Sequence, residues 1–205
     1  MDLRVWETST GRQLASFVHR QEDDPTKPYY VTARYAPDSR RLIVFEEHGM
    51  GVLDIAAGRK SSRPVHAELK NPWLSVVSPD GRLVATGNFV PLTPLNERQP
   101  KADLAIRVYE LASGKQIAAL EGHADQISGL AFSPDSRTVA TAAGNFWHHK
   151  DQTIRVWNVA TGRELRRLDN PDGAEHIDYL HDGRSVVTVG MDGVATVWDV
   201  SAPSS

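Results

Sequence analysis

A short motif recurs along this chain at constant internal spacing, and it constrains the fold more than any other feature. A large apolar residue ends a β-like run such as RVW, and a turn glycine follows five residues later. The pairs are Trp6 and Gly11, Leu53 and Gly58, Tyr109 and Gly114, and Trp157 and Gly162, and Trp198 ends a fifth such run. Several landmarks that keep one spacing are the signature of a repeat architecture. The sequence therefore predicts one series of similar structural units.

Two further sets of residues recur at a constant distance from other landmarks of the repeat. An aspartate stands six residues before the aromatic residue in three units, at Asp103, Asp151 and Asp192, and a threonine stands six residues after a turn aspartate, at Thr86, Thr141 and Thr188. The turns carry Pro-Asp at Pro37, Pro79 and Pro134, which suits a tight reversal between two strands. The residue after the aspartate often needs a left-handed backbone, which Gly81 and Gly183 adopt more easily than Ser39 and Ser136.

The central unit, residues 122–168, carries every landmark in order: Gly122-His123, the turn Ser133–Ser136, Thr141, Asp151, the run ending at Trp157, and Thr161-Gly162-Arg163. That order resembles a WD40 repeat, which forms one four-stranded blade of a β-propeller. The resemblance implies a buried network of His123, Thr141, Asp151 and Trp157. The neighbouring units keep Thr86 with Asp103 and Thr188 with Asp192 and Trp198, but they have Glu68 and Asn170 where the central unit has its histidine.

The fold class implied is all-β, a WD40 β-propeller of four-stranded antiparallel blades with about four to four and a half blades in this chain. The repeat domain spans residues 1–200, followed by a tail at 201–205, and its blades are 30–69, 73–121, 122–169 and 170–200, with a partial blade at 3–18. The last blade has no outer strand of its own. Three readings of ring closure stay open: the C-terminal part of a longer propeller, a four-bladed ring in which the outer strand Gln13 to Phe17 completes the last blade, or a homodimer closing an eight-bladed ring.

Composition excludes several classes of function. The chain has 205 residues, 40% of them hydrophobic, a net charge of −3 and a pI near 6.2, so it lacks the basic field that nucleic-acid binding requires. No apolar run is long enough to suggest a membrane partner. The absence of cysteine fits a reducing compartment, and we expect a cytoplasmic protein. No phosphate loop, nucleophile elbow or metalloprotease motif is present, so neither a catalytic site nor a cofactor is expected.

Insertions between the second and third strands, at 90–103 and 145–150, enlarge one face together with the loop at 19–29. Loops on a rigid scaffold often carry binding. The candidate partner-binding residues are Phe146, Trp147, His148, His149, Lys150, Asn96, Arg98 and Lys101. Trp147 could instead cover the core of its blade. His148 and His149 lack a third ligand at a recognisable spacing, which disfavours a metal site, and the structural network explains His123 without a role as general base.

These observations favour a non-catalytic scaffold that binds protein or peptide partners. The alternative is the C-terminal propeller part of a larger bacterial signalling enzyme, such as a serine/threonine kinase, because the repeats resemble those of bacterial multidomain proteins. A propeller with its own hydrolase activity would need acidic or histidine residues without a structural role, and the sequence offers none.

Overall fold

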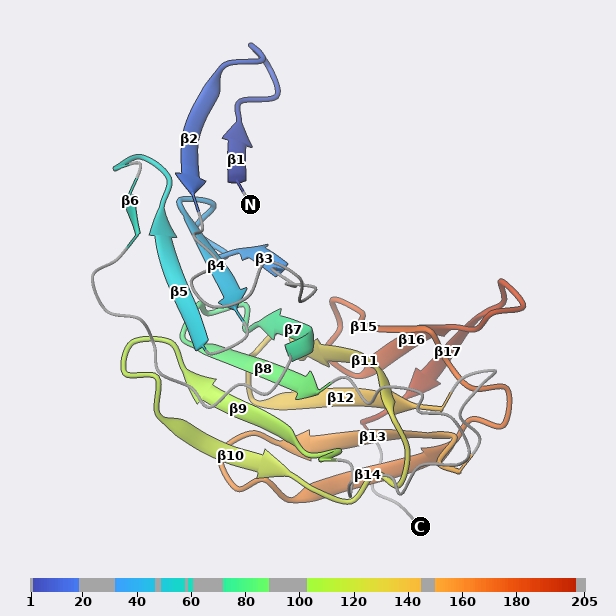
Figure 1. Ribbon diagram of the computed structural model, residues 1–205. Coiled ribbons are helices and arrows are strands. Elements are labelled where there is room, and N and C mark those ends of the chain that lie inside the picture. Colours follow the sequence, from blue (N-terminus) through green and yellow to red (C-terminus); the bar gives the residue numbers. More distant parts are fainter. Residues whose placement is uncertain are drawn as a thin grey trace, which may run out of the picture. The chain divides into compact units, whose positions relative to one another are not determined.

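The computed structural model describes residues 2–18, 32–46, 49–57, 59–60, 72–88, 103–144 and 150–201. In these residues every helix or strand is a β-strand, and neighbouring strands run antiparallel (Figure 1). The predicted all-β fold of four-stranded antiparallel sheets is confirmed. The chain divides into two compact units, residues 1–71 and residues 72–205, and each is described by itself.

The first unit contains two sheets. One pairs β1 (Asp2–Trp6) with β2 (Gln13–Val18), and the other has four strands in the order β3 (Thr32–Tyr35), β4 (Arg41–Glu46), β5 (Gly49–Asp54) and β6 (Arg59–Lys60). A cluster of Val5, Ala15, Leu42, Val44 and Leu53 packs the two sheets together. The short strand β6 is the fourth strand of its sheet, and residues 61–71, the rest of the blade predicted at 30–69, lie outside the described residues.

The second unit contains three sheets. The first consists of β7 (Pro72–Val77), β8 (Leu83–Asn88), β9 (Ile106–Glu110) and β10 (Gln116–Leu120). The second consists of β11 (Ile127–Phe132), β12 (Thr138–Ala143), β13 (Thr153–Asn158) and β14 (Glu164–Asp169). The third has three strands, β15 (His176–Tyr179), β16 (Ser185–Val189) and β17 (Ala195–Asp199), with β17 at its edge.

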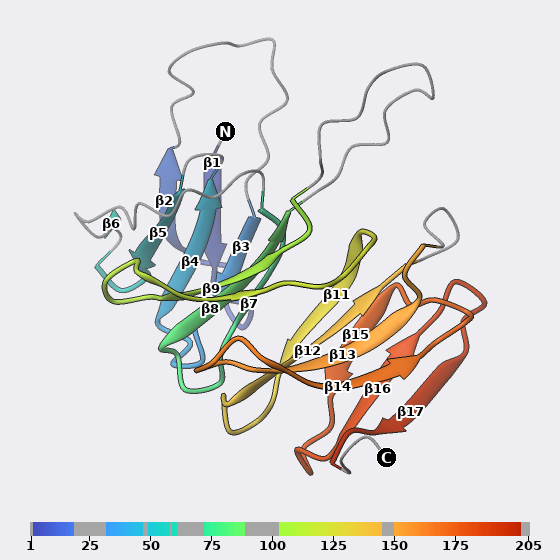
Figure 2. The same ribbon diagram turned by 90° about the horizontal axis from the view of Figure 1, so that it is seen from below.

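The middle sheet of the second unit is buried on both faces. Val139 and Trp157 pack with Ile106 and Leu120 of the preceding sheet, whereas residues on the opposite face of β12 and β13 pack with the following sheet. That second contact joins Ala140, Ala142 and Ile154 to Ala174, Ile177 and Val186. Successive sheets therefore stack face to face (Figure 2), and alternate residues of one strand serve two different cores.

The hairpin turns have the backbone that their sequences predict. Gly81 and Gly183 have φ of 69° and 64°, and Ser39 and Ser136 occupy the same left-handed region at 55° and 62°. In the second unit the turns also touch, because the Asp80 amide donates a hydrogen bond to Ser136 Oγ at 3.2 Å. The turn residues thus fix both the reversal of each hairpin and the contact between neighbouring sheets.

Candidate functional site

His123 lies at the centre of a buried polar network in the middle sheet of the second unit. It stands between β10 and β11, and its ring contacts residues from β12 and from the segment before β13. Nδ1 lies 2.8 Å from Asp151 Oδ2, and Nε2 lies 2.7 Å from Thr141 Oγ1. Both nitrogens of the imidazole are therefore used inside the protein.

The partners determine which atom donates in each bond. The indole Nε1–H of Trp157 donates to Thr141 Oγ1 at 2.9 Å. The threonine hydroxyl can then donate its own hydrogen to His123 Nε2, which leaves Nδ1–H of His123 to donate to the Asp151 carboxylate. A one-way chain of donors thus runs from Trp157 through Thr141 and His123 to Asp151.

The electrostatics of the pair agree with this arrangement. Burial lowers the pKa of His123 and outweighs the nearby Asp151 carboxylate, which acts to raise it. Burial acts to raise the pKa of Asp151, but hydrogen bonds from His123, Thr153 and the Ala124 amide hold that pKa well below its usual range. The pair is therefore a neutral imidazole beside an ionised carboxylate.

Sequence reasoning missed Arg155, which extends the network. Its side chain is buried, with the residue only 4% exposed, and the guanidinium donates to Asp151 Oδ2 and Glu164 Oε2 at 3.0 Å each. The guanidinium carbon also lies 6.0 Å from the Trp157 ring centroid. A Cβ at Gly122 would come within 2.8 Å of Arg155 Nη1, so the glycine before His123 makes room for the arginine.

A repeated spacing could have revealed this arginine. Arg155 follows Asp151 by four residues, and Arg107 follows Asp103 by the same interval in the preceding sheet. The second pair forms an ion pair at 2.7 Å. Because the pattern recurs with the sheet, it indicates a structural role for the arginine.

The other predicted network residues reproduce the contacts of the central network only in part. Trp198 donates its indole hydrogen bond to Thr188 Oγ1 at 2.8 Å, which reproduces the pair of the middle sheet. Asp192 accepts a hydrogen bond from the Val194 amide at 3.0 Å within its own turn. Thr86 is buried in β8, and Asp103 pairs with Arg107. The third sheet therefore keeps the aromatic-threonine bond without a histidine to extend it.

Seven of the eight predicted partner-binding residues lie outside the described residues: Phe146, Trp147, His148, His149, Asn96, Arg98 and Lys101. Lys150 is described and exposed, and its amide donates to Asp125 Oδ2 at 2.9 Å. Asp125 belongs to the connection between β10 and β11, so the end of the 145–150 insertion meets a loop that joins successive sheets.

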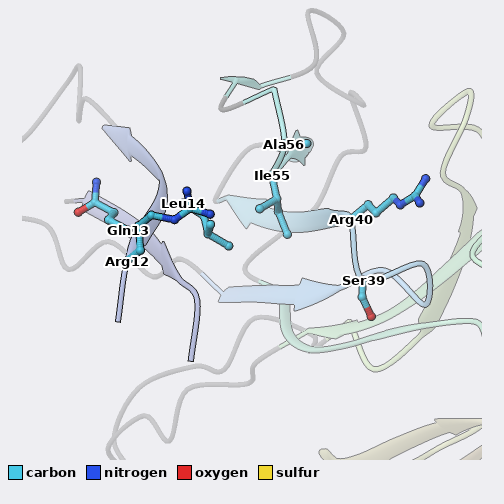
Figure 3. Close-up of a pocket in the computed structure, with 7 residues that line it drawn as sticks. All are labelled: Arg12, Gln13, Leu14, Ser39, Arg40, Ile55 and Ala56. Carbon is cyan, nitrogen blue, oxygen red and sulfur yellow. The ribbon is translucent and has the colours of Figure 1, made fainter. Parts of the chain in front are cut away.

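A shallow cleft of about 480 Å³ lies in the first unit, beside the start of β2 and the turn between β3 and β4. Figure 3 shows Leu14 and Ile55 on its two sides, with the side chain of Arg40 directed away. The lining brings together no acid, base and nucleophile, and the cleft has no feature of a catalytic site. Its aliphatic side chains belong to the surface between two hairpins.

The described part of the chain also lacks two other kinds of site. It holds no group of three or more histidine, cysteine or acidic side chains arranged to bind a metal ion. None of its elements is a helix long and apolar enough to cross a membrane.

Comparisons with known proteins agree with the repeat. The family described as "WD domain, G-beta repeat" matches residues 114–158. The chain is 34% identical over 88 residues to the uncharacterized WD repeat-containing protein sll1491 of Synechocystis, covering 42% of this chain and 24% of that protein. It is 36% identical over 93 residues to human coronin-7, covering 44% and 9% respectively.

A third relative is the nuclear distribution protein PAC1 of Arthroderma otae, which is 31% identical over 104 residues, or 49% of this chain and 23% of the relative. The chain thus spans less than a quarter of the length of each of these three relatives.

Proposed function

Because the chain belongs to the WD40-repeat family, we propose that it is a non-catalytic module that binds protein or peptide partners. Repeats of this kind supply a rigid surface rather than a reaction centre. The proposed binding surface is the face enlarged by the insertions at 90–103 and 145–150.

The observation that carries the proposal is the internal use of the ionisable groups in the central sheet. His123, Asp151 and Arg155 bind one another or Thr141, Trp157 and Glu164. A general base needs an accessible nitrogen or oxygen within reach of a substrate proton, and this network uses both ring nitrogens of its histidine. The hydrogen bonds and ion pairs of this network stiffen the sheet that carries the 145–150 insertion.

Stiffness matters for binding because a preformed surface loses little conformational entropy when it meets a partner. The bond from the Lys150 amide to Asp125 fixes one end of the 145–150 insertion, directly before the buried Asp151. The aromatic residues Phe146 and Trp147 are the proposed anchors, with His148, His149 and Lys150 beside them. Aromatic residues next to a cation suit the energetic centre of a protein interface.

Affinity measurements on substituted chains test this proposal. A tagged chain would capture its partner from an extract, and the identified partner would then be titrated against the native chain, Trp147→Ala and Arg163→Ala. Arg163 is exposed and lies beyond the opposite end of β13, which makes it a matched control. We expect Trp147→Ala to weaken the partner's Kd by about 30-fold, the loss of about 2 kcal/mol typical of an interface anchor.

The control should bind within about twofold of the native chain, because a surface charge outside an interface contributes little. Equal binding by Trp147→Ala and the native chain would contradict the proposed face. Urea denaturation of both variants separates the two roles of Trp147. A large loss of stability in Trp147→Ala would assign this residue to the covering of the core instead.

A further inference from the structure

The middle and third sheets of the second unit carry an aspartate at the same position, but its surroundings differ between them. In the middle sheet this aspartate is Asp151, which is 5% exposed and accepts hydrogen bonds from the side chains of His123, Thr153 and Arg155. Arg155 supplies the positive charge that neutralises the carboxylate. The charge of Asp151 is therefore balanced inside the protein.

Asp192 is the equivalent aspartate of the third sheet, and it lacks these donors. The residues at the three donor positions are Asn170, Val194 and Thr196. Thr196 takes the place of the arginine, since each lies opposite the network threonine of the preceding strand. Among the described residues Asp192 accepts a hydrogen bond only from the Val194 amide, at 3.0 Å, and forms no ion pair. The third sheet thus presents a carboxylate without its cation.

Asn170 adds a second unfilled group at this place. It stands where the middle sheet has its histidine, whose ring is directed at the aspartate, and it is 5% exposed. Its side-chain nitrogen Nδ2 is buried and has no hydrogen-bond acceptor among the described residues. Asparagine is shorter than histidine, so it does not bond to Asp192 as His123 bonds to Asp151. Buried donors without an acceptor are rare, and a bound ligand can supply one.

The backbone beside Asp192 brings another acceptor close to the carboxylate. Gly190 has no side chain, and a Cβ at this residue would lie 2.8 Å from Asp192 Oδ1 and 3.7 Å from the Gly173 carbonyl oxygen. The carboxylate and the carbonyl therefore face the same point. Within the described part of the chain the Gly173 carbonyl accepts no hydrogen bond. Two acceptors at one point suit the several N–H donors of a guanidinium group.

The neighbouring side chains also suit a cation with an apolar neighbour. Asp172 is exposed and Glu175 is half-buried, and neither carboxylate forms an ion pair with another described residue. Met191 precedes Asp192 and is 62% exposed. Its thioether side chain is flexible and adapts to apolar groups of different shapes. Negative charge and apolar surface thus lie side by side.

We propose that this place on the third sheet, defined by Asn170, Gly173 and Asp192 and called the arginine site, binds an arginine of a partner protein. The guanidinium would pair with the Asp192 carboxylate and donate to the Gly173 carbonyl. The partner would then supply the cation that Arg155 supplies in the middle sheet. Arginine fits better than lysine because its planar group donates to two acceptors at once. An aliphatic residue beside the arginine would pack on Met191.

This inference rests on the proposed function, because the arginine site adjoins the loop face. The connection 170–175 is bonded to both ends of the 145–150 insertion. The Ala174 amide donates to Gly144 O at 3.2 Å, and the Asn170 amide donates to Gln152 O at 2.9 Å. A partner held by the aromatic residues of the insertion therefore has the arginine site within reach.

Nuclear magnetic resonance titration of the isotope-labelled chain with the peptide acetyl-SLRLS-amide tests the arginine site. The control peptide has citrulline in place of arginine, which keeps the shape of the side chain and removes its charge. We expect the arginine peptide to bind at least about tenfold tighter, because hydrogen bonds between charged groups are the stronger kind. The largest shifts should be those of Asp192, Gly173 and the Asn170 side-chain amide.

Two substitutions in β17 add the same charge on opposite faces of the strand. Thr196→Arg places an arginine at the position equivalent to Arg155, so it should pair with Asp192 and weaken peptide binding at least about tenfold. Val197→Arg directs its side chain to the other face and should bind the peptide within about twofold of the native chain. Asp192→Asn keeps an acceptor for the Val194 amide and should also lose binding about tenfold.

Several results would overturn the arginine site. They are equal binding of the two peptides, no binding of either, and equal binding by Thr196→Arg and Val197→Arg. A dimer that Thr196→Arg dissociates would also overturn it, because the arginine would then come from a second copy of the chain.

Titration of the captured partner separates the arginine site from the proposed function. Full affinity of the partner for Asp192→Asn, with lost affinity for Trp147→Ala, would overturn the arginine site and leave the loop face in place. Full affinity for Trp147→Ala, with lost affinity for Asp192→Asn, would support the arginine site and contradict the aromatic anchor.

Discussion

Replacing Trp157 by alanine should destabilise the second unit more than any other single change in the central network. The side chain is 1% exposed and packs in the cluster that joins the first two sheets of the unit. Tryptophan-to-alanine changes in a packed core cost about 3 to 5 kcal/mol. The substitution also removes the indole donor to Thr141, which orders the hydroxyl that binds His123. We therefore expect a loss near the upper end of that range.

Urea denaturation followed by circular dichroism measures this loss. Trp157→Phe separates its two parts, because phenylalanine keeps most of the packing but loses the hydrogen bond, and we expect it to cost about 1 to 2 kcal/mol. Trp6→Ala is the matched control, since Trp6 occupies the equivalent position in β1 but is 50% exposed, and its cost should stay below about 1 kcal/mol. A loss below about 1 kcal/mol for Trp157→Ala would refute the proposed packing and register.

Three further changes test other parts of the account. Burial lowers the pKa of His123 below its ordinary 6.5, so the unfolded chain takes up a proton first as the pH falls. Its contribution to stability should therefore be complete above about pH 7 and decline below the ordinary pKa. The urea midpoint of the native chain should fall between pH 8 and pH 5 with a slope that His123→Gln lacks. Equal slopes of midpoint against pH would contradict a buried neutral histidine. Gly129→Ala should cost about 1 to 3 kcal/mol of stability, because the new Cβ would lie 2.8 Å from Ile177 Cγ2 and 3.0 Å from the Ile177 backbone nitrogen. Gly87→Ala is the control and should cost less, because its Cβ would meet nothing closer than 3.8 Å. Similar urea midpoints for both variants would show that the second and third sheets are not packed as described. Ser39→Gly should stabilise the first unit by about 0.5 kcal/mol, since the serine has φ of 55°, and a lower thermal midpoint would argue against strain at this turn.

The sequence carried enough information to predict the sheets, because their signals are local. The turn at Ser136 shows why, since its left-handed backbone follows from a Pro-Asp reversal between two apolar runs. Among the described residues the third sheet has three strands, each with alternating side chains. Short turns and alternating side chains determine such features within a few residues.

Arg155 was harder to predict because its partners lie on different strands. The ion pair with Glu164 joins β13 to β14. The ion pair with Asp151 requires Arg155 to be buried, and charged side chains are rarely buried. The repeated interval between aspartate and arginine was the available signal. Loop residues such as Trp147 carry no such periodicity, and their part in binding stays a prediction.

The most direct test of the central claim, that this module acts by binding a protein through its enlarged loop face, is site-specific photo-crosslinking to the captured partner. A photoreactive amino acid would be placed at Trp147 in one chain and at Arg163 in another. The account predicts crosslinks to the partner from position 147 and none above background from position 163. Crosslinks from position 163 alone would place the partner on the hairpin face and contradict the proposed binding surface.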